Sequence, residues 1–178
     1  MTGTYSLDDV ATKFRAQGRI AIVGASLAGL RAAEALRAKG FEGSLTIIGD
    51  EPHEPYDRPP LSKQVLKGWV PADHTKLPRL RRVDADWKLG VAAVALDRIN
   101  HVVKLANGEQ VGYDRLLIAT GTRARPWPVP EEGALRGVFT VRTVEDAAGL
   151  AAALKARPRR VLVVGSGFVG SEIASVCR

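Results

Sequence analysis

Two glycine-rich segments of this sequence have the residue types and spacing of loops that bind the phosphates of a dinucleotide. In the second segment, Gly165, Gly167 and Gly170 follow the apolar run 161–164 and form a complete G-x-G-x-x-G pattern. The first glycine allows a tight turn, the second lets backbone N–H groups approach a pyrophosphate, and the third lets helix and strand pack closely. The pattern predicts a pyrophosphate site at a helix start. A plain strand-to-helix corner is the alternative.

The first segment departs from this pattern at its middle position. Gly24 and Gly29 keep the outer positions, Ser26 replaces the second glycine, and Ala28 keeps the loop small. The serine adds a Cβ, so a pyrophosphate must lie slightly farther away, but the serine hydroxyl is able to donate to a phosphate oxygen. The segment therefore predicts a second, modified phosphate loop.

An acidic pair follows the first loop where such fingerprints carry a ribose-binding carboxylate. Asp50 and Glu51 come about 20 residues after that loop, at the end of a predicted strand. The alternative for this pair is a solvated acidic turn. Two phosphate loops in one chain point to two dinucleotides rather than one.

Alternating strand and helix patterns must position these loops, and they predict an α/β fold with a largely parallel sheet. We expect strands over 19–23, 44–48, 115–118 and 161–164. Helices are expected from Leu27 to just before Gly40, after the Thr143–Asp146 capping box, and after the second loop. Short β segments are expected from Trp87 to Ala119, where Asn107-Gly108 predicts a hairpin turn.

A proline-rich stretch separates the second strand from these β segments. Its prolines, Pro52, Pro55, Pro59 and Pro60, predict an irregular loop until Ser62, which we expect to cap a short helix through Leu66.

The composition is that of a globular chain with one sizeable core. The chain has 178 residues, of which 46% are hydrophobic and 25% charged, so a second full domain does not fit. The net charge of +7 favours anionic partners. No basic stripe is interleaved with aromatic residues, which argues against nucleic-acid binding.

The single cysteine, Cys177, excludes an intrachain disulfide and indicates a reducing, cytoplasmic location. We interpret it as a small core residue. The histidines have no metal-ligand spacing, so no metal is expected. Residues 1–18 hold no unbroken apolar run, so we expect a loose leader there and no membrane contact.

Four further segments carry a family resemblance when read in order with the first loop. "YDRPPLSK" (56–63), "LLIATG" (116–121), "VRTVEDA" (141–147) and "VLVVGSGFVGSE" (161–172) resemble FAD-dependent NAD(P)H:ferredoxin reductases, the putidaredoxin reductase and dioxygenase reductase type of pyridine nucleotide-disulfide oxidoreductases. The resemblance implies a Rossmann-type FAD domain that combines a parallel sheet, helices and a small antiparallel β meander. It also implies a second, NAD-binding Rossmann-type domain.

In these terms we divide the chain into three parts. Residues 1–18 are the leader, 19–157 the N-terminal part of the FAD-binding domain, and 158–178 the truncated start of the NAD(P)-binding domain, with its first strand and a partial helix. We expect that the chain is a fragment and that residues 1–178 alone do not turn over NADH. The carboxylate that distinguishes NADH from NADPH is expected after the last residue.

The resemblance assigns the site residues by position. Lys63 lies beside the flavin, and Glu172 pairs with it, so both are expected to be catalytic. The FAD contacts are expected from Gly24, Ser26, Leu27, Ala28, Gly29, Asp50, Glu51, Arg58, Lys63, Val94, Ala119, Thr120, Gly121 and Arg142, and the NAD(P) contacts from Gly165, Gly167, Phe168, Val169 and Gly170.

The implied function is the transfer of electrons from NADH or NADPH through FAD to a ferredoxin-type iron-sulfur protein that serves a cytochrome P450 or a dioxygenase. Two alternatives remain open from the residues. One is a non-catalytic FAD-binding module, and the other is a one-cofactor NAD dehydrogenase that uses only the first loop.

Overall fold

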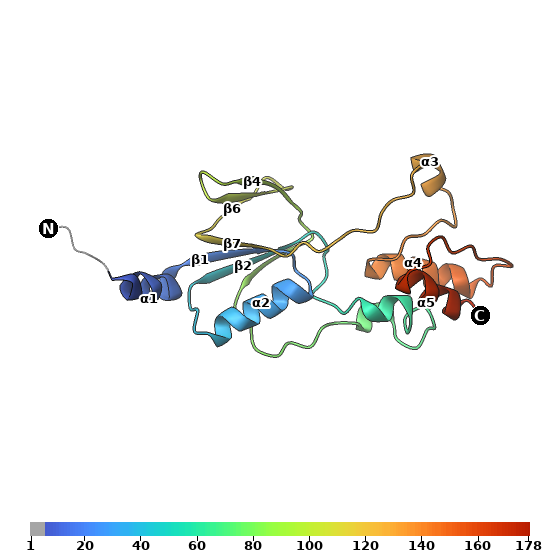
Figure 1. Cartoon of the computed structure of the whole chain (residues 1–178), viewed down its shortest axis with the longest axis horizontal. Helices are drawn as coiled ribbons and strands as arrows, with labels where there is room; N and C mark the ends of the chain where they lie inside the picture. Colours follow the sequence, from blue (N-terminus) through green and yellow to red (C-terminus); the bar gives the residue numbers. More distant parts are fainter. Residues whose placement is uncertain (1–5) are drawn as a thin grey trace. The chain divides into compact units, whose positions relative to one another are not determined.

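The computed structural model describes residues 6–178, which form two compact units (Figure 1). The first unit contains the described residues up to Pro55 and the segment Leu77–Gly121. The second contains Tyr56–Lys76 and Thr122–Arg178.

A four-stranded parallel sheet forms the centre of the first unit. Its strands are β1 (Arg19–Val23), β2 (Ser44–Gly49), β3 (Asp86–Leu89) and β7 (Arg115–Ile118), in the order β3-β2-β1-β7. The parallel sheet confirms the predicted α/β fold. β3 pairs with β2, so the first of the predicted short β segments joins this sheet rather than the meander.

The two faces of β1 and β2 are covered by different elements, because successive side chains of a strand point to opposite faces. Helix α2 (Leu27–Ala38) covers one face, where Leu30 and Ala33 pack with Ile20, Ile22 and other buried residues. Gly40, with a φ of +78°, follows the helix in the left-handed conformation predicted for its cap. In Figure 1 the helix lies below the sheet.

A three-stranded antiparallel sheet covers the other face and confirms the predicted meander. It consists of β4 (Ala93–Asp97), β5 (Val102–Leu105) and β6 (Gln110–Gly112), with Asn107-Gly108 at the β5–β6 turn. Ala21 and Ile48, which point away from α2, pack with Val103 and Leu105 of this sheet. The first unit therefore has three layers.

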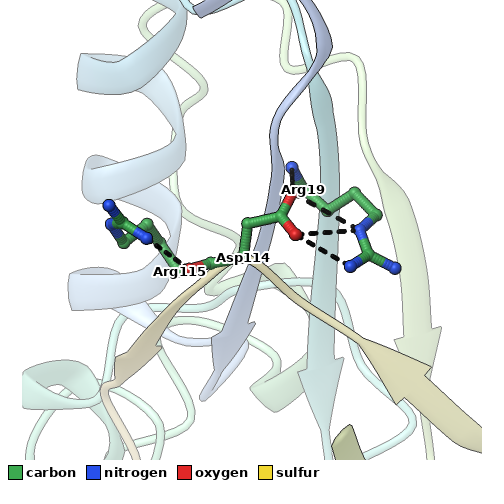
Figure 2. A network of polar contacts seen from close by, with 3 residues as sticks. All are labelled: Arg19, Asp114 and Arg115. Carbon is green, nitrogen blue, oxygen red and sulfur yellow. Dashed lines mark hydrogen bonds and ion pairs between the residues drawn. The ribbon is translucent and has the colours of Figure 1, made fainter. Parts of the chain in front are cut away.

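The amino-terminal ends of β1 and β7 are joined by polar contacts (Figure 2). The Asp114 carboxylate accepts a hydrogen bond of 2.8 Å from the Arg19 backbone amide. It also forms an ion pair of 2.8 Å with the Arg19 guanidinium. The Arg115 guanidinium donates to the Asp114 carbonyl at 2.7 Å.

The second unit is built from helices and turns. Its elements are η1 (Pro59–Ser62), η2 (Ala72–His74), α3 (Pro130–Gly133), α4 (Val144–Lys155) and α5 (Phe168–Val176). Tyr56, Leu61, Val65, Val144 and Ala147 form its buried cluster. Helix α4 begins with the predicted capping box of Thr143 and Asp146.

The expectation of a loose leader over residues 1–18 is wrong for its described part. Helix α1 (Leu7–Gln17) begins with a capping box of Ser6 and Asp9, which satisfies backbone donors at the helix start. Phe14 holds the helix to the first unit through its ring, whose centroid lies 5.7 Å from that of Phe41. Residues 1–5 lie outside the described part of the chain.

Three further local expectations are wrong. Residues 161–164 form no strand, because a strand needs a hydrogen-bonded neighbour and the described chain offers none there. The short helix begins at Pro59 rather than after Ser62, because proline is tolerated in a first helical turn. Cys177 is exposed rather than buried. No helix among residues 6–178 is both long and apolar enough to cross a membrane.

Candidate dinucleotide sites and a lysine–glutamate pair

The carboxyl ends of three parallel strands bring predicted site residues of the first unit to one edge of the sheet. Gly24 follows β1, Asp50 follows β2 and Ala119 follows β7. The Gly24 amide donates to the Ile48 carbonyl at 2.8 Å, and the Ala119 amide donates to the Val23 carbonyl at 2.7 Å. In the sheet β1 lies between β2 and β7, and the carboxyl ends of such parallel strands form the edge at which open α/β sheets bind ligands.

The outer glycines of the first loop are required by close backbone approach. Gly24 has a φ of +125°, and a Cβ there would overlap the Ala119 carbonyl. A Cβ on Gly29 would overlap the Gly24 carbonyl. These two glycines therefore fix the tight turn and the close packing that the fingerprint demands.

Ser26 occupies the middle position as the N-cap of α2, with extended backbone at a φ of −122°. Its side chain makes no capping hydrogen bond, so the hydroxyl remains available to a phosphate oxygen. Leu27 and Ala28, the first residues of α2, are exposed. Because the first amides of a helix lack intrahelical acceptors, this loop fits the pyrophosphate of a dinucleotide.

The second loop repeats this local geometry. Gly165 has a φ of +122°, and a Cβ on Gly170 would overlap the Gly165 carbonyl. Gly167 is the N-cap of α5, and a Cβ there would meet nothing within 4 Å. Phe168 and Val169, the first residues of α5, are exposed. The loop keeps an open approach to backbone amides, as a pyrophosphate requires.

Lys63 and Glu172 form the ion pair that the family resemblance implied. The Lys63 Nζ lies 2.8 Å from the Glu172 Oε2, and the two side chains are 40% and 31% exposed. The Ser62 hydroxyl donates to the same oxygen at 2.5 Å. The bonds from Lys63 and Ser62 hold the pKa of Glu172 below its usual value. The carboxylate is therefore kept ionised beside a fixed cation.

Arg58 and Arg142 belong to one polar network in the second unit. The Arg58 guanidinium donates to the Tyr56 hydroxyl at 2.9 Å and to the Arg142 carbonyl at 2.7 Å. The Val144 amide donates to the Tyr56 hydroxyl at 3.3 Å. The Arg142 Nε is buried and has no hydrogen-bond partner among the described residues. A buried guanidinium N–H of this kind suits an anionic or carbonyl acceptor.

The predicted site residues are divided between the two units. The first unit holds the first loop with Asp50, Glu51 and the segment 119–121 at one sheet edge, while Val94 lies in β4 and is 63% exposed. The second unit holds Arg58, Lys63, Arg142, the second loop and Glu172.

Sequence reasoning missed two participants, Ser62 and Tyr56. Ser62 was expected only as a helix cap, and Tyr56 only as part of a motif. Their position in the sequence could have indicated them, since both lie inside the "YDRPPLSK" segment that carries Arg58 and Lys63.

The chain also matches a known protein family. The family model described as pyridine nucleotide-disulphide oxidoreductase matches residues 18–178. The chain belongs to this family. The match leaves out helix α1, which precedes it.

Two curated relatives are named as parts of dioxygenase systems. The chain is 42% identical over 161 residues to the biphenyl dioxygenase system ferredoxin--NAD(+) reductase component of Paraburkholderia xenovorans (strain LB400), covering 89% of this chain and 39% of that protein. It is 39% identical to the benzene 1,2-dioxygenase system ferredoxin--NAD(+) reductase subunit of Pseudomonas putida, with the same coverage.

Solved structures agree with this membership of the pyridine nucleotide-disulphide oxidoreductases. Fdr9 superposes with a TM-score of 0.79 at 41% identity, covering 90% of this chain and 39% of that one. The putidaredoxin reductase–putidaredoxin complex matches with a TM-score of 0.78 at 36% identity, covering 91% and 40%. The chain therefore spans about two fifths of the length of these relatives.

Proposed function

We propose that this chain is the FAD-binding part, and the beginning of the NAD-binding part, of a flavoprotein oxidoreductase. The complete enzyme passes electrons from NADH or NADPH through FAD to a ferredoxin-type iron-sulfur protein that serves a dioxygenase or a cytochrome P450. The observation that carries the proposal is the Lys63–Glu172 ion pair, because it joins the "YDRPPLSK" segment to the helix of the second glycine loop.

The residues of the first unit fit the adenosine and pyrophosphate of FAD. Gly24 and Gly29 leave no room for a Cβ. The amides at the start of α2 and the Ser26 hydroxyl, which makes no capping hydrogen bond, are suited to bind the pyrophosphate. Asp50 follows β2 at the position for binding ribose hydroxyls. We assign Leu27, Ala28, Glu51, Val94 and 119–121 to contacts along the same cofactor.

The residues of the second unit fit the reactive part of the site. FAD, when bound, supplies hydride acceptance from reduced nicotinamide and release of single electrons. A fixed cation stabilises negative charge that develops near it, and we assign that role to Lys63. Glu172 keeps the Lys63 amine oriented. Arg58 and Arg142 are assigned to polar contacts with the cofactor, which the buried Nε of Arg142 supports.

The second loop is assigned to the nicotinamide dinucleotide. Gly165, Gly167, Phe168, Val169 and Gly170 bind its pyrophosphate in this proposal, because they repeat the conformation of the first loop. The names of the relatives, which act with NAD(+), support NADH as the donor. A cytoplasmic location is supported by the single cysteine.

Cofactor binding is the direct test. The 178-residue chain is titrated into FAD, and quenching of the flavin fluorescence is expected. Binding of NAD without any binding of flavin would instead establish the one-cofactor dehydrogenase. Bound flavin that NADH fails to reduce, in the protein expressed from its complete reading frame, would establish the non-catalytic module.

The role of the ion pair is tested separately, in the protein expressed from its complete reading frame. Lys63→Met is expected to slow flavin reduction by NADH in an anaerobic stopped-flow experiment, since the charge that stabilises the transition state is lost. Lys155→Met, which removes an exposed lysine at the end of α4, is the matched control and is expected to leave the rate unchanged. Equal rates for Lys63→Met and wild type would refute the assigned role.

The ferredoxin partner is tested by salt. The net charge of +7 suits an acidic partner, because complementary charge speeds encounter. Reduction of ferredoxin by the complete enzyme is expected to slow markedly as salt rises. A rate that does not change with salt would argue against electrostatic docking.

A further inference from the structure

Two consecutive residues donate to one oxygen of Glu172. The Ser62 hydroxyl lies 2.5 Å and the Lys63 Nζ 2.8 Å from the Glu172 Oε2. Ser62 and Glu172 are 110 positions apart in the sequence. This contact therefore depends on the fold of the second unit and not on local sequence.

The two donors differ in how firmly they are held. Ser62 is 5% exposed and ends η1, so its hydroxyl lies at a fixed place on a short side chain. The Lys63 side chain is 40% exposed and carries its amine on a flexible four-carbon stem. A buried hydroxyl needs a hydrogen-bond partner, and Glu172 is the partner that Ser62 has. The serine is therefore the rigid member of the pair of donors.

We propose that Ser62 is a positioning residue, which holds the Glu172 carboxylate in the orientation that pairs with Lys63. The hydrogen bond itself stands independently of enzyme activity. Its consequence for flavin reduction rests on the function proposed above, because Ser62 acts on the reaction only through Glu172 and Lys63.

The charges around Glu172 make the effect of Ser62 measurable. Helix α5 carries no other charged side chain. The charged groups beside η1 are Arg58 and Lys63, and those of α4 are Glu145, Asp146 and Lys155. Of these, Lys63 acts on the pKa of Glu172, and the Ser62 hydroxyl lowers it further. Removing the Ser62 hydroxyl therefore removes one of the two principal causes of the lowered pKa of Glu172.

The test is a carbon-13 NMR titration of the Glu172 carboxyl in the 178-residue chain, with Glu172→Gln used to assign the signal. Ser62→Ala is expected to raise the pKa of Glu172 toward its ordinary value, and Ser62→Thr, which keeps a hydroxyl, is expected to restore the low pKa. Ser171→Ala removes the hydroxyl of an exposed neighbour on α5 and is expected to change nothing. An unchanged pKa in Ser62→Ala would overturn the proposal.

The catalytic consequence is read from the pH dependence of flavin reduction in the complete enzyme. With Ser62→Ala, Glu172 takes up its proton at higher pH, so the acid side of the profile is expected to move to higher pH. On that limb the rate is expected to fall by about tenfold, as for the loss of one hydrogen bond to a charged group. Ser62→Thr is expected to return the profile to that of wild type.

The two proposals fail in different ways. If Lys63→Met leaves flavin reduction unchanged while Ser62→Ala raises the pKa of Glu172, the role of the ion pair in the reaction is refuted and the positioning by Ser62 stands. If Lys63→Met slows the reaction while Ser62→Ala and wild type share one pKa for Glu172, the positioning role is refuted and the function stands.

Discussion

The carboxylate of Asp114 binds both the backbone amide and the guanidinium of Arg19, and so ties the start of β7 to the start of β1 (Figure 2). The Asp114 amide donates in return to the Arg19 carbonyl at 2.9 Å. These contacts lie at the amino-terminal edge of the sheet, away from the glycine loop that follows β1.

Asp114→Asn is expected to destabilise the first unit at neutral pH and much less in acid. The Arg19 side chain, and then its amide, hold the pKa of Asp114 below its ordinary value of 3.8. Because this pKa is lower in the folded chain than in the unfolded one, the stabilisation is present above about pH 4 and lost as pH falls through the lowered pKa.

Urea unfolding at about pH 7 and about pH 3 checks this expectation. The difference in unfolding free energy between Asp114→Asn and wild type is expected to shrink at the lower pH. A difference that is equal at both values would show that the charge of Asp114 contributes nothing.

Glu34 is a buried carboxylate on α2, and its replacement by alanine is expected to lower the free energy of unfolding by about 1–3 kcal/mol. The side chain is 5% exposed and accepts a hydrogen bond from the Leu80 amide at 2.7 Å, and the Arg31 guanidinium pairs with it at 2.7 Å. Burial raises the pKa of Glu34, but the Arg31 side chain and the backbone amides lower it more, so it stays ionised.

Urea denaturation of three variants measures this contribution. Glu34→Gln keeps an acceptor for the Leu80 amide and is expected to cost less than Glu34→Ala. Glu42→Ala, at an exposed position, is expected to change stability by less than about 0.5 kcal/mol. Equal effects of Glu34→Ala and Glu42→Ala would contradict the assigned hydrogen bonds.

Gly24→Ala and Gly165→Ala are a matched pair with different expected outcomes. The two glycines have similar φ angles, +125° at Gly24 and +122° at Gly165. A residue with a side chain at such a φ has a backbone strain of about 1–3 kcal/mol. Only at Gly24 does the new Cβ also overlap a neighbour, the Ala119 carbonyl. Gly24→Ala is therefore expected to be the more disruptive change.

Amide hydrogen exchange reports each loop through the helix that follows it. Gly24→Ala is expected to speed exchange in α2 more than Gly165→Ala speeds exchange in α5. The reverse order would show that the Ala119 contact does not constrain the first loop.

Ser26 separates a structural role from a binding role. Ser26→Gly is expected to keep FAD binding with little loss of stability, because the Ser26 side chain makes no capping hydrogen bond. Ser26→Leu is expected to abolish FAD binding, because its side chain fills the space of the pyrophosphate. Fluorescence titration with FAD checks both variants. Tight FAD binding by Ser26→Leu would show that the pyrophosphate does not bind at the first loop.

The features that the sequence predicts well are those encoded over a few residues. The glycine spacing predicts both loops, and the second loop takes its conformation although no strand forms before it. Likewise, Thr143 and Asp146 predict the start of α4. In each case the interacting groups are close in sequence, so no distant partner is needed.

The features that escape prediction depend on distant partners. The Arg19–Asp114 contact joins residues 95 positions apart, and the Ser62–Glu172 contact joins residues 110 apart. The strand expected over 161–164 lacks a neighbouring strand among the described residues. Glu34 left a faint signal, since it follows Leu30 by one helical turn on the apolar side of α2.

Helix α1 and the first glycine loop stand at opposite ends of β1. Phe14 anchors the helix by its ring, while Lys13 on the same helix is exposed. A linker attached at Lys13 would therefore tether the protein to an electrode or bead by the end of the first unit that is opposite to the proposed cofactor edge.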